Sequence, residues 1–134
     1  MKTTLQPGLT LTSRIDIDAG RTISFLGEDS RVYATPFVLY DVEIISQDLI
    51  KAHLDDTETS VGSHVDISHL APTPLGMWAD IQVTVTAVKG RKIDLAFESR
   101  DALDLIARGT HTRYVVDKYQ TAEQIKSKKQ KATG

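Results

Sequence analysis

The sequence predicts a single α+β domain in which one long helix is wrapped by an antiparallel β-sheet. Only one stretch, from about Pro36 to His53, has the apolar spacing of a long helix. The segments after it alternate apolar and polar residues with a period of two, which is typical of half-buried strands. A helix that is apolar around much of its circumference needs cover on more than one side, and the following sheet is the expected cover.

The first elements are a short strand and the helix. The strand is expected at Arg21 to Leu26. The helix is expected to begin at Thr35-Pro36, because a threonine hydroxyl can cap exposed amide groups and proline is preorganised for the first helical position. Apolar residues recur along it at three- and four-residue steps and also spread around the remaining circumference. We therefore expect a largely buried helix.

Four strands are expected after the helix. They run over Ser60–His69, Met77–Val88, Arg91–Arg100 and Leu105–Val116. The Lys89-Gly90 pair marks a hairpin turn between the second and the third. In the first of these strands, alternation places five residues on one face: Val61, Ser63, Val65, Ile67 and His69. The predicted order is strand, long helix and antiparallel meander.

The composition is that of one ordinary globular domain. The chain has 134 residues, of which 40% are hydrophobic and 25% are charged, which suffices for one core. We expect the domain to span residues 1–117 and a lysine-rich tail, either a short helix or disordered, to span residues 118–134. The formal net charge of −2 argues against a nucleic-acid binder.

Several kinds of site are excluded by what the sequence lacks. Without cysteine there is no disulfide, no thiolate nucleophile and no Cys-based zinc site. The four histidines form no tight cluster of ligands, so no metal is expected. The amino terminus has no apolar signal core, and no stretch approaches the roughly 18 to 20 apolar residues that cross a bilayer. We expect a cytoplasmic protein that does not bind membranes.

Four residues are candidates for chemistry, and each has a structural alternative. Thr35 can simply cap the helix. Glu43 lies inside the helix among apolar neighbours, where burial suits a general base or nucleophile, whereas a structural glutamate there needs a cationic partner. His69 ends a strand on its apolar face, which is a common position for a core histidine. Gly62 either forms a bulge or lets a backbone N–H approach a ligand oxygen.

Three further features are less specific. His64 and Asp66 alternate on the opposite face of the first long strand and could form a metal pair or a base with its orienting group. His111 is expected to be a surface or interface residue. Pro72 and Pro74 force an irregular connection directly after His69, and such loops commonly border sites.

Taken together, several segments resemble one known family. The segments Tyr33–Pro36, Thr59–Asp66 and Ser68–Gly76 occur in order and with compatible spacing, and the similarity continues through Gly109–Val116. They resemble the fluoroacetyl-CoA thioesterase-like hotdog proteins over about residues 30 to 117. The resemblance implies the hotdog fold, an α+β architecture with a long central helix wrapped by an antiparallel sheet.

The resemblance also implies a site and an activity. By position, Thr35, Glu43 and His69 match the family's catalytic residues, and Gly62 matches the glycine associated with the thioester carbonyl. It implies a homodimer that hydrolyses acyl-CoA thioesters to free acid and CoA, with no cofactor, since CoA is part of the substrate. Leu26–Ser30 is polar and lacks the aromatic lid of a fluoroacetyl-specialised enzyme, so we expect short-chain acyl-CoA substrates in general.

Three alternatives stay open at this point. The same groove could belong to a noncatalytic acyl-CoA-binding module. A hotdog hydratase acting on enoyl thioesters would use an Asp/His pair such as Asp66 and His64. A purely structural dimerisation domain is the third alternative, but it gives Glu43 no purpose.

Overall fold

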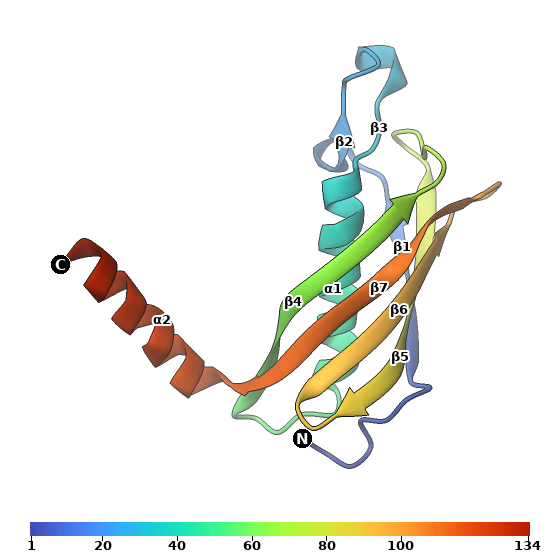
Figure 1. Ribbon diagram of the computed structural model, residues 1–134. Helices are drawn as coiled ribbons and strands as arrows, with labels where there is room; N and C mark the ends of the chain where they lie inside the picture. Colours follow the sequence, from blue (N-terminus) through green and yellow to red (C-terminus); the bar gives the residue numbers. More distant parts are fainter.

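A five-stranded antiparallel sheet packs against one side of helix α1 (Thr35–Lys51) in the computed structural model, which describes residues 1–134 (Figure 1). The strand order in the sheet is β1-β5-β6-β7-β4, so β1 and β4 are the two edges. The strands are β1 (Thr10–Asp16), β4 (Glu58–His69), β5 (Trp78–Lys89), β6 (Lys92–Arg100) and β7 (Leu105–Asp117). The predicted α+β architecture is confirmed.

The long helix is confirmed, but its predicted burial is wrong for one side. Its sheet-facing residues are apolar and buried: Val38, Val42, Ile45, Leu49 and Ile50. On the other side Phe37, Tyr40 and Ile44 are 38%, 54% and 46% exposed. The sheet of one chain covers only one side of α1, so the wide apolar circumference leaves a second face uncovered.

The four strands predicted after the helix are confirmed to within two residues at each end. Strand β1 was not predicted, because its two apolar residues, Leu11 and Ile15, are separated by polar residues and are only half-buried. The strand predicted at Arg21 to Leu26 is only Thr22–Ile23 (β2), which pairs with Val32–Tyr33 (β3). These two strands and the short 3₁₀ turns Ala19–Arg21 and Glu28–Ser30 form an arm, residues 19–33, beyond the start of α1 (Figure 1).

A bulge in β4 changes which residues face the helix. The pairing of β4 with β7 shifts between Gly62 and His64. Ser60 and Gly62 therefore face α1 before the bulge, and Val65, Ile67 and His69 face it afterwards. The prediction that Val61 and Ser63 share that face is wrong, because strict alternation does not hold across a bulge; Val61 is 40% exposed.

Residues 118–133 form a second helix, α2 (Lys118–Thr133), which projects away from the sheet (Figure 1). The Asp117 side chain caps it by accepting a hydrogen bond from the Gln120 amide at 2.8 Å. No residue of α2 is buried. Neither helix of the chain combines the length and the apolar character that crossing a membrane requires.

Candidate active site

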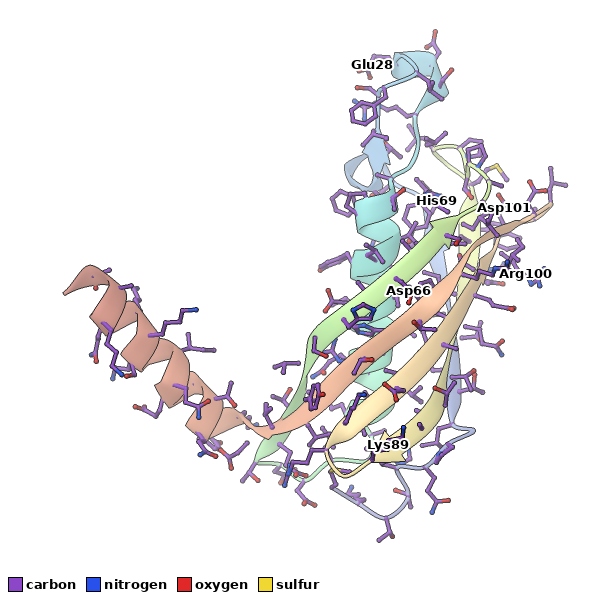
Figure 2. All side chains as sticks on the ribbon, viewed as in Figure 1. Glu28, Asp66, His69, Lys89, Arg100 and Asp101 are labelled. Carbon is purple, nitrogen blue, oxygen red and sulfur yellow. The ribbon has the colours of Figure 1, made fainter.

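Thr35 is the first residue of α1, but it does not cap the helix. The N-cap is Ala34, and no side chain caps this end. The Thr35 hydroxyl instead lies 2.6 Å from Nδ1 of His69, at the end of β4 (Figure 2). The prediction that Thr35 caps the helix is therefore wrong, and its hydroxyl forms a hydrogen bond with His69 instead.

His69 has one ring nitrogen in this hydrogen bond and one without a partner. Its Nε2 is buried and makes no hydrogen bond. Burial also lowers the pKa of the His69 imidazole below its ordinary value, so the ring is neutral at neutral pH. A neutral imidazole with an unsatisfied nitrogen can accept a proton or hydrogen-bond a ligand, and satisfying a buried polar atom recovers about 1–3 kcal/mol.

The Thr35–His69 pair lies in a mostly apolar pocket of about 330 Å³. The arm forms one wall, and the loop between β4 and β5, which contains the two predicted site-bordering prolines, forms another. The lining residues are Ile23, Val32, Tyr33, Thr35, His69, Leu70, Ala71 and Pro72. A pocket with an apolar wall and one polar pair suits a short hydrocarbon group attached to a reactive carbonyl.

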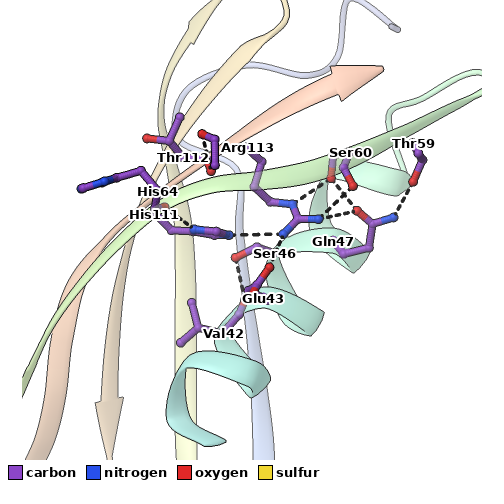
Figure 3. A network of polar contacts seen from close by, with 11 residues as sticks. Val42, Glu43, Ser46, Gln47, Thr59, Ser60, His64, His111, Thr112 and Arg113 are labelled. Carbon is purple, nitrogen blue, oxygen red and sulfur yellow. Dashed lines mark hydrogen bonds and ion pairs between the residues drawn. The ribbon is translucent and has the colours of Figure 1, made fainter. Parts of the chain in front are cut away.

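Glu43 is not enclosed by apolar neighbours, as its sequence context suggested. Its side chain is 50% exposed, and its Oε2 lies 3.2 Å from an Nη1 donor of Arg113 on β7 (Figure 3). The expected burial is wrong because position 43 lies toward the uncovered side of α1. Arg113 supplies the cation, and its guanidinium, which is 7% exposed, is the buried member of the pair.

Arg113 is fixed by a network that sequence reasoning did not identify (Figure 3). Its guanidinium donates to the Ser60 hydroxyl at 2.8 Å, to the Ser60 carbonyl at 2.9 Å and to the Gln47 side-chain oxygen at 3.2 Å. Burial lowers the pKa of Arg113, but a guanidinium stays charged at neutral pH. The only sequence signal for Arg113 was its place in the Gly109–Val116 segment of the family resemblance.

His111 also belongs to this network, so the part of its prediction that places it on the surface is wrong. It is 2% exposed, and its Nδ1 donates to the His64 carbonyl at 2.7 Å. With Nδ1 as the donor, a neutral ring presents Nε2 as an acceptor to Arg113 at 3.3 Å. Burial lowers the pKa of His111, which favours this neutral form.

Gly62 leaves the space that the Glu43 carboxylate fills. A Cβ at this position would lie 2.8 Å from Oε2 of Glu43 and 3.3 Å from both the Arg113 guanidinium and the His111 ring. Glu43, Gly62 and His111 line a second pocket, of about 310 Å³, together with Ser63, His64 and Val65. The structure therefore brings Glu43 and Gly62 together, as a pair.

The three predicted catalytic residues do not share one pocket within a chain. Thr35 and His69 lie in the first pocket and Glu43 lies in the second. Eight residues separate Thr35 from Glu43 on α1, which is a rise of about 12 Å along the helix axis. The alternative pair, His64 and Asp66, lies 3.9 Å apart, and both side chains are more than 60% exposed. Figure 2 shows Asp66 on the face of the sheet turned away from α1.

The family described as "Fluoroacetyl-CoA-specific thioesterase" (FlK) matches residues 17–119 of this chain. The chain belongs to this family. The match includes every residue of both pockets, and it confirms the resemblance seen in the sequence. As a member of the FlK family, the chain is a thioester hydrolase.

Individual relatives agree with this assignment. The chain is 26% identical over 123 residues to the fluoroacetyl-CoA thioesterase of Streptantibioticus cattleyicolor, covering 87% of this chain and 88% of the relative. A crystal structure of a mutant FlK superposes with a TM-score of 0.86 at 24% identity, covering 95% of this chain and 99% of the other. A Thermus thermophilus thioesterase superfamily member gives a TM-score of 0.89 at 22% identity, covering 98% of both chains. The hotdog fold is confirmed.

Proposed function

We propose that this chain hydrolyses short-chain acyl-CoA thioesters to free acid and CoA, as a homodimer and without a cofactor. The observation that supports this most directly is the neutral His69, with Thr35 on one nitrogen and no partner on the other, at an apolar pocket of about 330 Å³. One similar structure is a mutant FlK in complex with fluoroacetate and CoA, with a TM-score of 0.79. A cytoplasmic location is part of the proposal, and the absence of cysteine is consistent with a reducing compartment.

The uncovered side of the molecule supports the homodimer. Strand β4 has 12 residues and is an edge of the sheet, so a row of its backbone groups is available for pairing. The uncovered face of α1, with Phe37, Tyr40 and Ile44, adds exposed apolar surface. A second copy that pairs through β4 would satisfy the unpaired backbone groups of this edge. The same isologous contact would cover the apolar face of α1.

The same contact would assemble a complete site from two half-sites. Gly62 lies in the first half of β4 and His69 is its last residue, and each lines its own pocket. Antiparallel pairing of two β4 strands about a point midway between these residues would place His69 of one chain beside Gly62 of the other. Thr35 and His69 of one chain would then act together with Glu43 of the partner subunit.

The chemistry follows from these positions. The thioester carbonyl would sit beside Gly62, where the missing side chain leaves room and a backbone N–H can stabilise the developing oxyanion. Glu43 would activate water or attack the carbonyl directly, while His69, held by Thr35, would accept and return the proton. When water attacks, its oxygen forms a bond to the carbonyl carbon, the carbon–sulfur bond breaks, and a proton of that water goes to the CoA sulfur. When Glu43 attacks first, His69 supplies the proton to the CoA sulfur, and water then hydrolyses the acyl–glutamyl anhydride to the free acid and returns the proton to His69.

Thiol release from a panel of acyl-CoAs tests this function. We expect free CoA from acetyl-CoA and other short-chain thioesters at a rate proportional to enzyme concentration. Binding without thiol release would indicate a noncatalytic acyl-CoA-binding module. Loss of enoyl absorbance without thiol release would indicate a hydratase. Either result would overturn the proposal.

A further inference from the structure

A buried carboxylate in α1 has no part in the proposed chemistry. Asp41 is 3% exposed, although it lies in the second turn of the helix that begins at Thr35. Its oxygens accept two hydrogen bonds from the Arg21 guanidinium, each of 3.0 Å, and a third from the Tyr33 hydroxyl. A buried charge is tolerated only where such partners satisfy it, so all three residues must be held in fixed positions.

These three residues, Arg21, Tyr33 and Asp41, form a clamp between the arm and the helix. Arg21 and Tyr33 belong to the arm, and Asp41 is the only residue of α1 whose side chain hydrogen-bonds to it. Arg21 makes a second connection, because its carbonyl accepts a hydrogen bond from the Ala34 amide at 2.9 Å, directly before Thr35. The clamp therefore ties the arm to α1 on both sides of Thr35 in the sequence.

The part of the arm that the clamp holds is a wall of the acyl pocket. Ile23 from β2 and Val32 from β3 line the pocket on one side, and Leu70 and Pro72 line it from the loop after β4. The arm also bonds to this loop through its backbone, from the Tyr33 amide to the Thr73 carbonyl at 2.8 Å. A second backbone hydrogen bond runs from the Leu75 amide to the Arg31 carbonyl at 3.0 Å. Toward α1, the side-chain hydrogen bonds that hold the arm are those of the clamp.

We propose that the clamp sets the acyl-chain length the enzyme accepts, by fixing the distance of the apolar wall from the Thr35–His69 pair. Arg21, Tyr33 and Asp41 are thus positioning residues. This inference rests on the proposed thioesterase function. A bidentate Arg–carboxylate pair has one preferred geometry, and the tyrosine hydroxyl adds a third direction, so the wall has little freedom to move back. Without the clamp, the apolar wall formed by the arm can move away from the Thr35–His69 pair and make room for a longer acyl chain.

The test compares kcat/KM for acetyl-CoA and hexanoyl-CoA in wild type, Asp41→Asn and Tyr33→Phe. Asp41→Asn removes the charge of the bidentate pair and leaves Arg21 with Asp18, which accepts a hydrogen bond from its guanidinium at 2.8 Å. Tyr33→Phe removes one hydroxyl and leaves the Arg21–Asp41 ion pair, so it is the variant least disturbing to folding. We expect wild type to favour acetyl-CoA and both variants to reduce that preference, Asp41→Asn by about tenfold. A smaller folded fraction lowers both rates equally, so a purely structural role would leave the ratio unchanged.

A matched control is available on the same arm. Glu28 pairs with Arg31 at 2.9 Å, also through an arginine–carboxylate contact, but it lies at the tip of the arm with its side chain 75% exposed (Figure 2). Glu28→Gln is expected to keep the wild-type ratio. An unchanged ratio in both clamp variants, or an equal change in Glu28→Gln, would overturn the clamp proposal while wild type remains active. Absence of thiol release from every acyl-CoA with wild type would instead overturn the proposed function and, with it, the clamp.

Discussion

The pocket of Thr35 and His69 and the pocket of Glu43 and Gly62 lie on the same helix and strand but differ in chemistry. The first is mostly apolar and contains a neutral hydrogen-bonded pair with a free ring nitrogen. The second is polar and contains a half-exposed carboxylate against a buried arginine. The first can transfer a proton and hold an acyl group but has no carboxylate, and the second has the carboxylate but no acyl pocket. Each contains what the other lacks.

The largest effect is expected from removing the charge of the second pocket. Glu43→Gln should lower kcat/KM by about 10²- to 10⁴-fold, the usual contribution of a general base. The substituted glutamine keeps a side-chain oxygen that can accept from Arg113, and Arg113 keeps its hydrogen bonds to Ser60 and Gln47, so the free energy of unfolding should change by about 1 kcal/mol. Thiol release and thermal unfolding of the same preparation check both values. A folded Glu43→Gln variant with full turnover would exclude Glu43 from the reaction.

A smaller effect is expected from the hydroxyl in the first pocket. Thr35→Val removes the partner of His69 Nδ1 and should lower kcat by about 10- to 100-fold. Thr35→Ser keeps a hydroxyl at the same place and should retain most of the activity. Steady-state kinetics on both variants separate the role of the hydroxyl from that of the side-chain volume. Equal losses in the two variants would contradict a hydrogen-bonding role.

Gly62→Ala should affect the second pocket of its own chain and, in the proposed dimer, the first pocket of the other chain. The added Cβ would lie 2.8 Å from the Glu43 carboxylate, which is the end of a flexible side chain and can move aside. We expect a loss of about tenfold in kcat/KM with little change in thermal stability. In the dimer, nuclear magnetic resonance should show a changed environment for the His69 ring, because the proposed pairing of the two β4 strands places this ring beside Gly62 of the partner subunit. An unchanged His69 ring in a dimeric Gly62→Ala variant would contradict that placement.

The smallest effect is a shift along the pH axis. Burial lowers the pKa of His69, so the ring stays neutral to lower pH than a free imidazole. The acid limb of kcat/KM should therefore have its midpoint below the usual histidine value of about 6.5. Stability should also fall as pH drops below that value, because the unfolded state binds the proton more readily. An acid limb centred above 6.5 would contradict the burial of this ring.

Much of the fold could be predicted from residue spacing. The pattern of α1 and of the four later strands is local, so the sequence shows it directly. Strand β1 was missed because it lies at a half-buried edge of the sheet and has only two apolar residues, Leu11 and Ile15, with three polar residues between them. Such a segment lacks the regular apolar alternation by which a strand is predicted. For Gly62, the sequence left open a bulge and a backbone N–H that approaches a ligand. The bulge decides which β4 residues face the helix, and it is visible only in the pairing of β4 with β7.

The sequence points to Thr35, Glu43, Gly62 and His69 as candidate site residues, which stays a prediction, but it does not show how they are arranged. The Thr35 hydroxyl could hydrogen-bond either to the nearby helix amides or to His69, which is distant in the sequence. Only the folded structure shows that the partner is His69. Arg113 is 70 residues from Glu43 in the sequence, so no local pattern identifies it as the partner of the carboxylate. The separation into two pockets follows from the helix rise between Thr35 and Glu43, which a match of residue types does not show.

Subunit complementation tests the two half-sites most directly. Glu43→Gln and His69→Asn homodimers should each be inactive, since every site in them lacks one group. In a mixed dimer, one site would combine the intact His69 of one chain with the intact Glu43 of the other. Refolding the two variants together at equal concentrations should therefore restore about a quarter of wild-type activity, because half the dimers are mixed and each contains one intact site. No recovery in a mixture shown to contain mixed dimers would contradict a site shared between subunits.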